Sequence, residues 1–227
     1  MENLKYFLNL AEISYKPKDE IESTLSGVRY FDSLNWSDEC TQFFLYYKGS
    51  TLYIVFRGSS SASDFVTDVK FFLNELPNEF LSQKNNIKVH SGFLEQFLSV
   101  RSTILNQIAL CPAAYEICVI GHSLGGSLAT LCAFFLKTVY PRRFIKCVTF
   151  GSPRVGNDDF VKKFDEIINK SIRCVNADDI VTRRPYWGYL HVKGEYNIGK
   201  SANVFYNFFG NVKDHYLSSY SNSLSNQ

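Results

Sequence analysis

The feature that most constrains this chain is one serine set between two glycines, where the hydrophobic pattern changes from strand-like to helix-like. Residues 117–120 (ICVI) form a short apolar run typical of a buried strand, and residues 126–131 (GSLATL) begin a helix-like run. Residues 121–125 (GHSLG) between them fit the pattern G-x-S-x-G. A sharp strand-to-helix turn here forces Ser123 into a strained backbone conformation, in which side chains two positions away on either side would collide.

Such a turn presents a serine hydroxyl for attack. It projects the hydroxyl of Ser123 into a cleft and leaves the backbone N–H of Leu124 at a helix N-terminus, where unpaired N–H groups favour an anion. We therefore interpret Ser123 as an attacking nucleophile. The side chain of His122 points away from that of Ser123 in a turn of this kind, so His122 is predicted to be a packed structural residue.

The pattern on either side of the turn predicts the fold class. Strand-like and helix-like runs alternate from residue 87 to residue 176, which predicts an α/β fold with a mostly parallel central sheet and helices on both faces. Adjacent strand-like runs within 41–56 add an antiparallel edge. The predicted elements are a helix at 2–14, two strands within 41–56, a strand at 87–90, a helix at 91–109, a strand at 116–120, a helix ending near 141, a strand at 145–151, a helix within 158–170, a strand at 171–177 and a hairpin within 191–206. The polar tail after residue 218 is expected to be frayed.

Length and composition narrow the function classes. The 227 residues contain no repeat or long linker, so we expect one domain over residues 1–227. With 45% hydrophobic and 20% charged residues, the chain has the profile of a soluble globular protein. A net charge of +2 offers no electrostatic case for nucleic-acid binding.

The same properties predict the compartment. No apolar run approaches the roughly 20 residues needed to cross a bilayer. The N-terminal stretch lacks the basic, apolar and small-residue segments of a signal peptide, so an intracellular, cytoplasmic location is expected. The six cysteines show no metal-ligand spacing, and several lie in apolar runs, as small buried residues do in a reducing compartment. We expect no metal ion and no organic cofactor.

A serine nucleophile needs a base to take its proton and an acid to hold that base. In a hydrolase with this turn, the acid and then the histidine follow the serine along the chain. Two histidines follow: His191 lies in strand-like surroundings, and His215 lies in a late segment that can reach over the sheet, which favours His215. Asp178 and Asp179 both lie just past the end of a strand, and the residues alone leave the choice between them open.

A series of motifs extends this interpretation. They are YIVFRGSSSASDFVTD (53–68), VHSGF (89–93), VIGHSLGGSLATL (119–131), TFGSPRVGNDDF (149–160), DIV (179–181) and HYLSSY (215–220). Together they resemble, in order, the motifs of the class 3 lipases, the family of the fungal triacylglycerol lipases. The resemblance spans about residues 40–220 and implies an α/β-hydrolase fold.

The resemblance also implies roles for individual residues. It implies Asp179 as the acid, because the family's aspartate directly precedes Ile/Val-Val, and His215 as the base, because the family has a non-catalytic histidine where His191 lies. It implies an oxyanion hole formed by Ser59, through its backbone N–H with its hydroxyl as a second candidate donor, and by the backbone N–H of Leu124.

The segment that follows Ser59 resembles the lid of the family. Phe65 and Val66 in that segment are predicted to shield the site or line the acyl pocket. The secreted fungal members usually have Trp where this chain has Phe65, so the resemblance leaves interfacial activation open.

The resemblance predicts a serine carboxylic-ester hydrolase that acts on lipid esters, as acylglycerol lipases do. The partner would be the lipid ester, reached through transient contact with a membrane or lipid-droplet surface. Two alternatives stay open: a phospholipase A1 or galactolipase, and a non-catalytic lipid- or partner-binding module on the same fold, because a fold alone does not prove activity.

Overall fold

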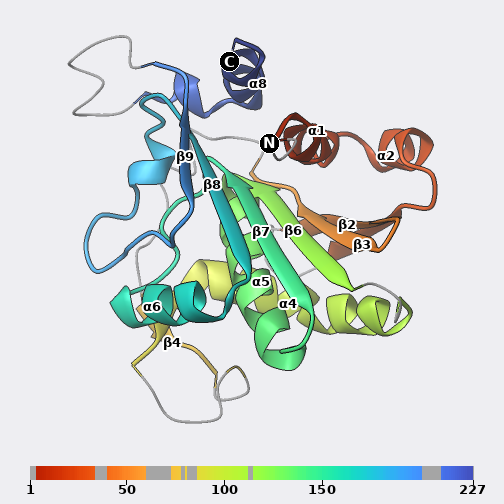
Figure 1. Cartoon of the computed structure of the whole chain (residues 1–227), viewed down its shortest axis with the longest axis horizontal. Coiled ribbons are helices and arrows are strands. Elements are labelled where there is room, and N and C mark those ends of the chain that lie inside the picture. The colour runs from red at the N-terminus through yellow and green to blue at the C-terminus, as the bar shows by residue number, and fades with distance from the viewer. Residues whose placement is uncertain are drawn as a thin grey trace.

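A seven-stranded sheet in the order β1-β2-β3-β6-β7-β8-β9 forms the centre of the molecule (Figure 1). The computed structural model describes residues 4–33, 40–59, 73–77, 80, 86–111, 115–200 and 211–226. The strands of this sheet are β1 (Arg29–Ser33), β2 (Thr41–Lys48), β3 (Thr51–Phe56), β6 (Glu116–His122), β7 (Phe144–Phe150), β8 (Lys170–Asn176) and β9 (Glu195–Ile198). A separate antiparallel pair joins β4 (Leu73–Glu75) to β5 (Lys88–His90).

The directions of the strands confirm the predicted fold class. Strands β3, β6, β7, β8 and β9 run parallel to one another, and β1, β2 and β3 form an antiparallel edge. Parallel strands end at the same edge of a sheet, so the loops that follow β3, β6, β7 and β8 meet at one edge, where ligand sites of such sheets form.

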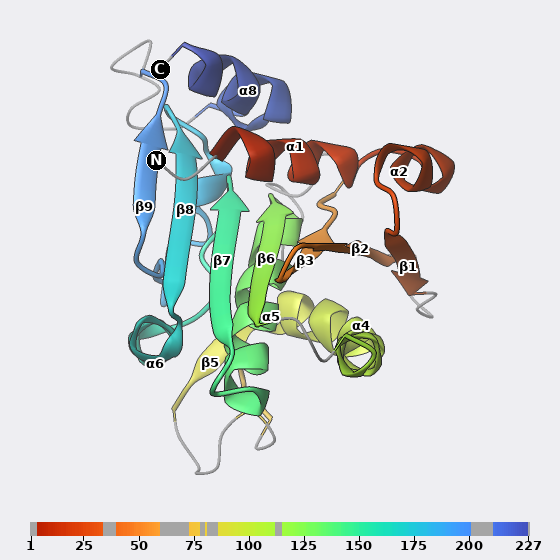
Figure 2. The same cartoon turned by 45° about the vertical axis from the view of Figure 1, so that its right-hand side comes forward.

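Helices cover both faces of the sheet, as predicted. They are α1 (Leu4–Ile13), α2 (Lys18–Thr24), α4 (Ser91–Ala109), α5 (Leu124–Val139), α6 (Asp158–Ile167) and α8 (Leu217–Ser225), with short 3-10 helices η2 (Val181–Arg183) and η3 (Lys213–His215). Helices α4, α5 and α6 pack on one face, whereas α1 and α8 pack on the other. Figure 2 shows α1 and α8 side by side above the upper ends of the strands. Within the described ranges, no helix combines the length and the apolar character needed to span a membrane.

The apolar run before the turn at Ser123 contributes to both cores. Ile117 and Val119 pack with α4 and α5, whereas Cys118 and Ile120 pack with α1 and α8. Successive side chains of a strand point to opposite faces. A strand covered on both faces therefore needs a continuous apolar run, which is the pattern from which this strand was predicted.

The predicted fraying of the C-terminal tail is wrong. Residues Leu217–Ser225 form α8, in which Tyr220 is 0% exposed and Leu224 is 5% exposed. Leu217, Tyr220 and Leu224 are spaced three and four residues apart, so they share one helix face, and this face packs into the same core as α1. That spacing is present in the sequence and is the signal that the polar composition of the tail obscured.

The predicted hairpin is only partly described. Its first strand is β9, which pairs with β8 in the parallel direction, and the backbone turns at Gly199 with φ 70°. The second predicted strand falls within residues 201–210, which lie outside the described residues. The hydrophobic pattern did not predict α2, β1 or β4.

The packing of α5 generates a stability prediction. Phe134 is 0% exposed, and its ring centroid lies 5.1 Å from that of Phe160. Phe134→Ala is expected to lower the free energy of unfolding by about 3–5 kcal/mol, because it removes buried surface and leaves a cavity. Urea unfolding measures this change. Leu110→Ala, at a residue 64% exposed, serves as the control and should change the same quantity by less than about 0.5 kcal/mol.

Candidate active site

Ser123 occupies the turn between β6 and α5 with φ 59° and ψ −129°, a conformation that residues other than glycine rarely adopt. Glycines make room for it. A Cβ on Gly121 would lie 2.0 Å from the carbonyl oxygen of Gly125, and a Cβ on Gly125 would lie 2.5 Å from that of Phe56. The N–H of Ser123 donates to the carbonyl of Phe150 at 3.0 Å. The strained turn predicted from the sequence is therefore present, and the neighbouring strand holds it in place.

A carboxylate and an imidazole meet at the same edge of the sheet. His215 Nδ1 lies 3.0 Å and 2.9 Å from the two carboxylate oxygens of Asp179, and both side chains are 0% exposed. A carboxylate only accepts, so Nδ1 carries the proton and the lone pair stays on Nε2. Asp178 instead pairs with Arg183, with 2.9 Å between the charged atoms. The structure thus brings Asp179, and not Asp178, against His215.

Ser123 and the Asp179–His215 pair both lie against the backbone at Phe150 and Gly151. Ser123 bonds to the carbonyl of Phe150, and a Cβ on the next residue, Gly151, would lie 2.8 Å from His215 Nδ1 and 2.7 Å from Asp179 Oδ2. Within the described residues, neither Ser123 Oγ nor His215 Nε2 has a hydrogen-bond partner, although both atoms are buried. Buried polar atoms are normally paired, so an unpaired hydroxyl and an unpaired ring nitrogen here are groups available for proton transfer.

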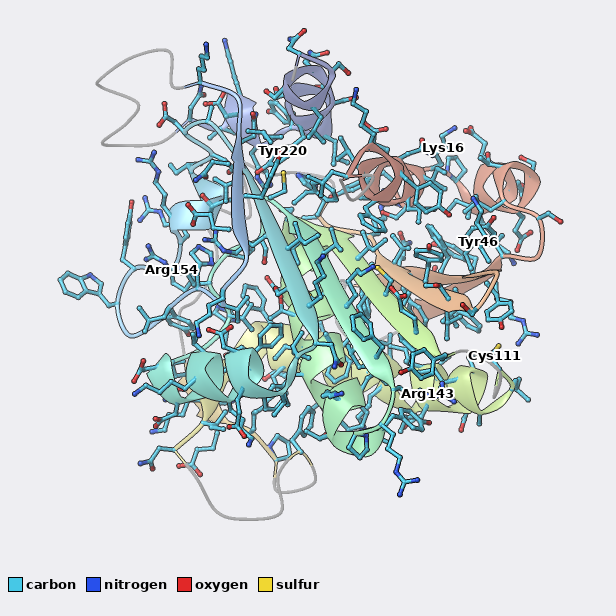
Figure 3. All side chains as sticks on the ribbon, in the orientation of Figure 1. Lys16, Tyr46, Cys111, Arg143, Arg154 and Tyr220 are labelled. Atoms are coloured by element: carbon cyan, nitrogen blue, oxygen red, sulfur yellow. The ribbon has the colours of Figure 1, made fainter. Side chains whose placement is uncertain are left out.

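Tyr220 is a residue of this site that the sequence analysis missed, because it lies on the helix that was expected to be frayed. Its hydroxyl donates to Asp179 Oδ2 at 2.6 Å and accepts the N–H of Asn176 at 3.2 Å. Burial and the neighbouring Asp179 charge raise the pKa of Tyr220 well above its usual value, so the hydroxyl stays a donor. The N–H of Val181 donates to the other carboxylate oxygen at 2.9 Å. Figure 3 shows Tyr220 at the upper ends of the strands, near α8.

The groups predicted for the oxyanion hole lie beside the nucleophile turn. Leu124 begins α5, and the first N–H groups of a helix have no partner within it. Strand β3 runs parallel to β6, and the chain beyond it passes the serine, since a Cβ on Gly58 would lie 3.2 Å from the Cβ of Ser123. Ser59 follows directly and is half-buried. The structure therefore places Ser59 one residue beyond the backbone that packs on Ser123.

The other histidines contact backbone groups. His122 Nε2 donates to the carbonyl of His215 at 2.8 Å, and the two rings stack with centroids 4.6 Å apart. His191 Nε2 donates to the carbonyl of Thr182 at 2.5 Å, and burial lowers the pKa of His191 to about 3. His90 accepts a backbone N–H at 3.3 Å and caps the N-terminus of α4.

The residues predicted for the lid and acyl pocket, Phe65 and Val66, lie outside the described residues.

Across the ranges that the structure describes, no three His, Cys, Asp or Glu side chains gather as the ligands of a metal ion would.

The sequence is similar to lipases and to a phospholipase. It is 37% identical over 161 residues to a lipase of Rhizomucor miehei, a match that covers 64% of this chain and 41% of that protein. It is 32% identical over 147 residues to the chloroplastic phospholipase A(1) DAD1 of Arabidopsis thaliana, a match that covers 58% of this chain and 33% of that protein. The matches thus span between a third and about two fifths of the length of these relatives.

The fold is that of a solved lipase. A triacylglycerol lipase whose catalytic centre is formed by a serine protease triad matches this structure with a TM-score of 0.75 and 28% sequence identity, over 93% of this chain and 91% of that one. This likeness confirms the predicted α/β-hydrolase fold. A family model described as lipase (class 3) matches residues 53–189, more than half of the chain. The chain therefore belongs to the class 3 lipase family.

Proposed function

We propose that this chain is a serine carboxylic-ester hydrolase that acts on lipid esters of the acylglycerol type through Ser123, Asp179 and His215. The observation that carries the proposal is the fully buried Asp179–His215 pair, at 2.9 Å, beside a serine held in a strained turn. A nucleophile, a base and an orienting acid are the groups that acyl transfer requires, and strain of this kind concentrates at active sites.

The first half of the reaction forms an acyl-enzyme. His215, oriented by Asp179, takes the proton of Ser123 through Nε2 as Oγ attacks the ester carbonyl. The carbonyl oxygen becomes an oxyanion, which the backbone N–H groups of Ser59 and Leu124 stabilise by about 3 kcal/mol each. The intermediate then collapses, and the alcohol leaves with the proton from His215.

The second half releases the acid. Water enters in place of the alcohol, His215 takes a proton from it, and the hydroxide attacks the acyl carbonyl. Ser123 leaves with the proton from His215, and the free fatty acid departs. Tyr220 acts through Asp179: its hydroxyl donates to the carboxylate and so helps to keep the carboxylate in the orientation that holds the imidazole.

The substrate class has two candidates. The similarity to fungal lipases favours acylglycerols, and the similarity to an Arabidopsis phospholipase A(1) keeps phospholipids, and with them galactolipids, as the second candidate. The non-catalytic alternative would not require an intact nucleophile, base and acid.

The intracellular location stays a prediction. Cys132, Cys147 and Cys174 are reduced and buried, as small apolar residues are in proteins of a reducing compartment, and this supports the prediction. Cell fractionation tests it, and recovery of the protein in the medium would contradict it.

An exposed aromatic loop supports contact with a lipid surface. Trp187 is 91% exposed, and Tyr186 and Leu190 beside it are 45% and 46% exposed. The guanidinium of Arg184 lies 4.4 Å from the centre of the Tyr186 ring. Amphipathic aromatic rings next to cations are typical of segments that lie at the boundary between lipid and water.

Replacing the nucleophile tests the proposed activity. Ser123→Ala is expected to lower the turnover of a p-nitrophenyl ester at least about a thousandfold, because the nucleophile is lost while the fold persists.

A second experiment tests the substrate class: the hydrolysis of diacylglycerol, phosphatidylcholine and galactolipid by the wild type is measured in parallel, and diacylglycerol should be hydrolysed fastest. Turnover by Ser123→Ala at the wild-type rate would support the non-catalytic alternative, and faster hydrolysis of phosphatidylcholine would assign the phospholipase alternative.

Removing the hydroxyl of Tyr220 tests its role at the carboxylate. Tyr220→Phe is expected to reduce kcat about tenfold and to lower the free energy of unfolding by about 1–3 kcal/mol, because a buried charge loses a donor. Ester turnover and urea unfolding measure the two effects. Tyr216→Phe, at a half-exposed neighbour, is the matched control and should leave both quantities nearly unchanged. Equal values for the two variants would remove Tyr220 from the site.

The aromatic loop generates a separate prediction. Trp187→Ala is expected to slow hydrolysis of an emulsified ester severalfold and to leave the rate on a monomeric ester unchanged, because only the emulsified substrate presents a surface. Tyr115→Ala serves as the control. Tyr115 is 68% exposed and directly precedes β6, at the end of that strand remote from Ser123. Equal loss on both kinds of substrate would show that the loop does not act at the surface.

A further inference from the structure

A line of hydrogen bonds enters the candidate site from the N-terminal segment. Tyr15 lies two residues beyond the end of α1, and its hydroxyl is 2.8 Å from His122 Nδ1. The same hydroxyl accepts the backbone N–H of Gly58. On the other side of the ring, His122 Nε2 lies 2.8 Å from the carbonyl oxygen of His215. Four segments that are distant in sequence are therefore joined by three consecutive hydrogen bonds.

The last acceptor, the carbonyl oxygen of His215, determines which atom carries the proton in each of these hydrogen bonds. A carbonyl oxygen only accepts, so Nε2 of His122 carries the proton and donates to His215. Nδ1 of His122 is then an acceptor, and the Tyr15 hydroxyl donates to it. Burial lowers the pKa of His122 well below its usual value, so the ring stays neutral and keeps one donor and one acceptor. Every bond on the line thus runs in one direction, from Gly58 to His215.

Each contact on the line adjoins a group of the proposed reaction. Gly58 directly precedes Ser59, His122 directly precedes Ser123, and the carbonyl that accepts the last bond belongs to the base itself. A Cβ on Gly58 would lie 2.3 Å from the Tyr15 hydroxyl oxygen and 2.5 Å from the carbonyl oxygen of His122, so this close approach requires glycine.

Ring packing holds the line in place. The Tyr15 and His122 rings meet edge to face with centroids 5.8 Å apart, and the Arg57 guanidinium lies 5.6 Å from the centre of the Tyr15 ring. The His122 ring in turn stacks on that of His215. Both rings of the line are therefore fixed by packing as well as by their polar atoms.

We propose that Tyr15 and His122 are positioning residues, which hold the backbone before Ser59 and the base His215 in a fixed relation to Ser123. The inference rests on the proposed function. The base needs such support because η3, which carries it, has only three residues. Tyr220 holds the carboxylate that faces the imidazole of His215, and His122 bonds to the backbone carbonyl of His215. Tyr15 lies outside the matched family segment 53–189, so this role does not follow from that match.

Removing one oxygen atom tests the role of Tyr15. Tyr15→Phe keeps the ring and loses both hydroxyl contacts, so kcat on a monomeric p-nitrophenyl ester should fall about tenfold per competent site while KM stays within about twofold. Titration with a fluorophosphonate counts the competent sites, which separates slower chemistry from loss of folded protein. Tyr6→Phe, on the preceding helix α1, removes the hydroxyl of a tyrosine whose ring packs against Tyr53 and should leave kcat unchanged.

Two amides test the role of His122. The side-chain nitrogen of Gln reaches the place of Nε2, whereas that of Asn reaches the place of Nδ1. His122→Gln should therefore keep the donor to the His215 carbonyl and retain severalfold more kcat per titrated site than His122→Asn. This comparison also stands if Tyr15→Phe yields little folded protein.

The outcomes separate this inference from the proposed function. An unchanged kcat in Tyr15→Phe, or equal kcat values for His122→Gln and His122→Asn, would overturn the positioning role while an inactive Ser123→Ala leaves the proposed function standing. Wild-type turnover by Ser123→Ala would instead overturn the proposed function.

Discussion

The buried pair of Asp179 and His215 is the interaction on which the rest of the site depends. A carboxylate withdrawn from water is strongly destabilising unless donors surround it. Asp179 receives donors from the His215 imidazole, the Tyr220 hydroxyl and the N–H of Val181. These donors lie on η3, on α8 and at the start of η2. The charge is therefore stabilised only when the C-terminal segment has folded onto the sheet.

The strain at Ser123 is held by the same architecture. A non-glycine residue at φ 59° persists only when its surroundings determine its conformation, and here β6, α5 and the bond to Phe150 do so. The two terminal helices complete the frame. Glu12 of α1 hydrogen-bonds to Ser221 of α8, and Figure 2 shows these helices side by side. A tyrosine on α8 and another just beyond α1 reach the site from this pair.

The parallel sheet explains why chemistry gathers at one edge. Strands β3, β6 and β8 end there together, so the backbone before Ser59, the proposed nucleophile Ser123 and the proposed acid Asp179 all emerge at the same edge of the sheet. The proposed base, His215, comes from a segment that lies outside the parallel strands, and its position depends on contacts rather than on strand direction. The proposed roles of His122 and Tyr220 concern this base or the acid that orients it, and Tyr15 joins His122 to the backbone before Ser59.

Local pattern was enough to predict the turn at Ser123 and most of the sheet and helices, because glycine sterics and hydrophobic periodicity act over a few residues. The residues alone left Asp178 and Asp179 open and favoured His215 only by position, and the family resemblance supplied the assignments. Tertiary structure decided which aspartate meets the imidazole, ordered the tail as α8, and joined Tyr15 to His122 and His122 to His215. Those last bonds link residues 107 and 93 positions apart, so no local pattern records them.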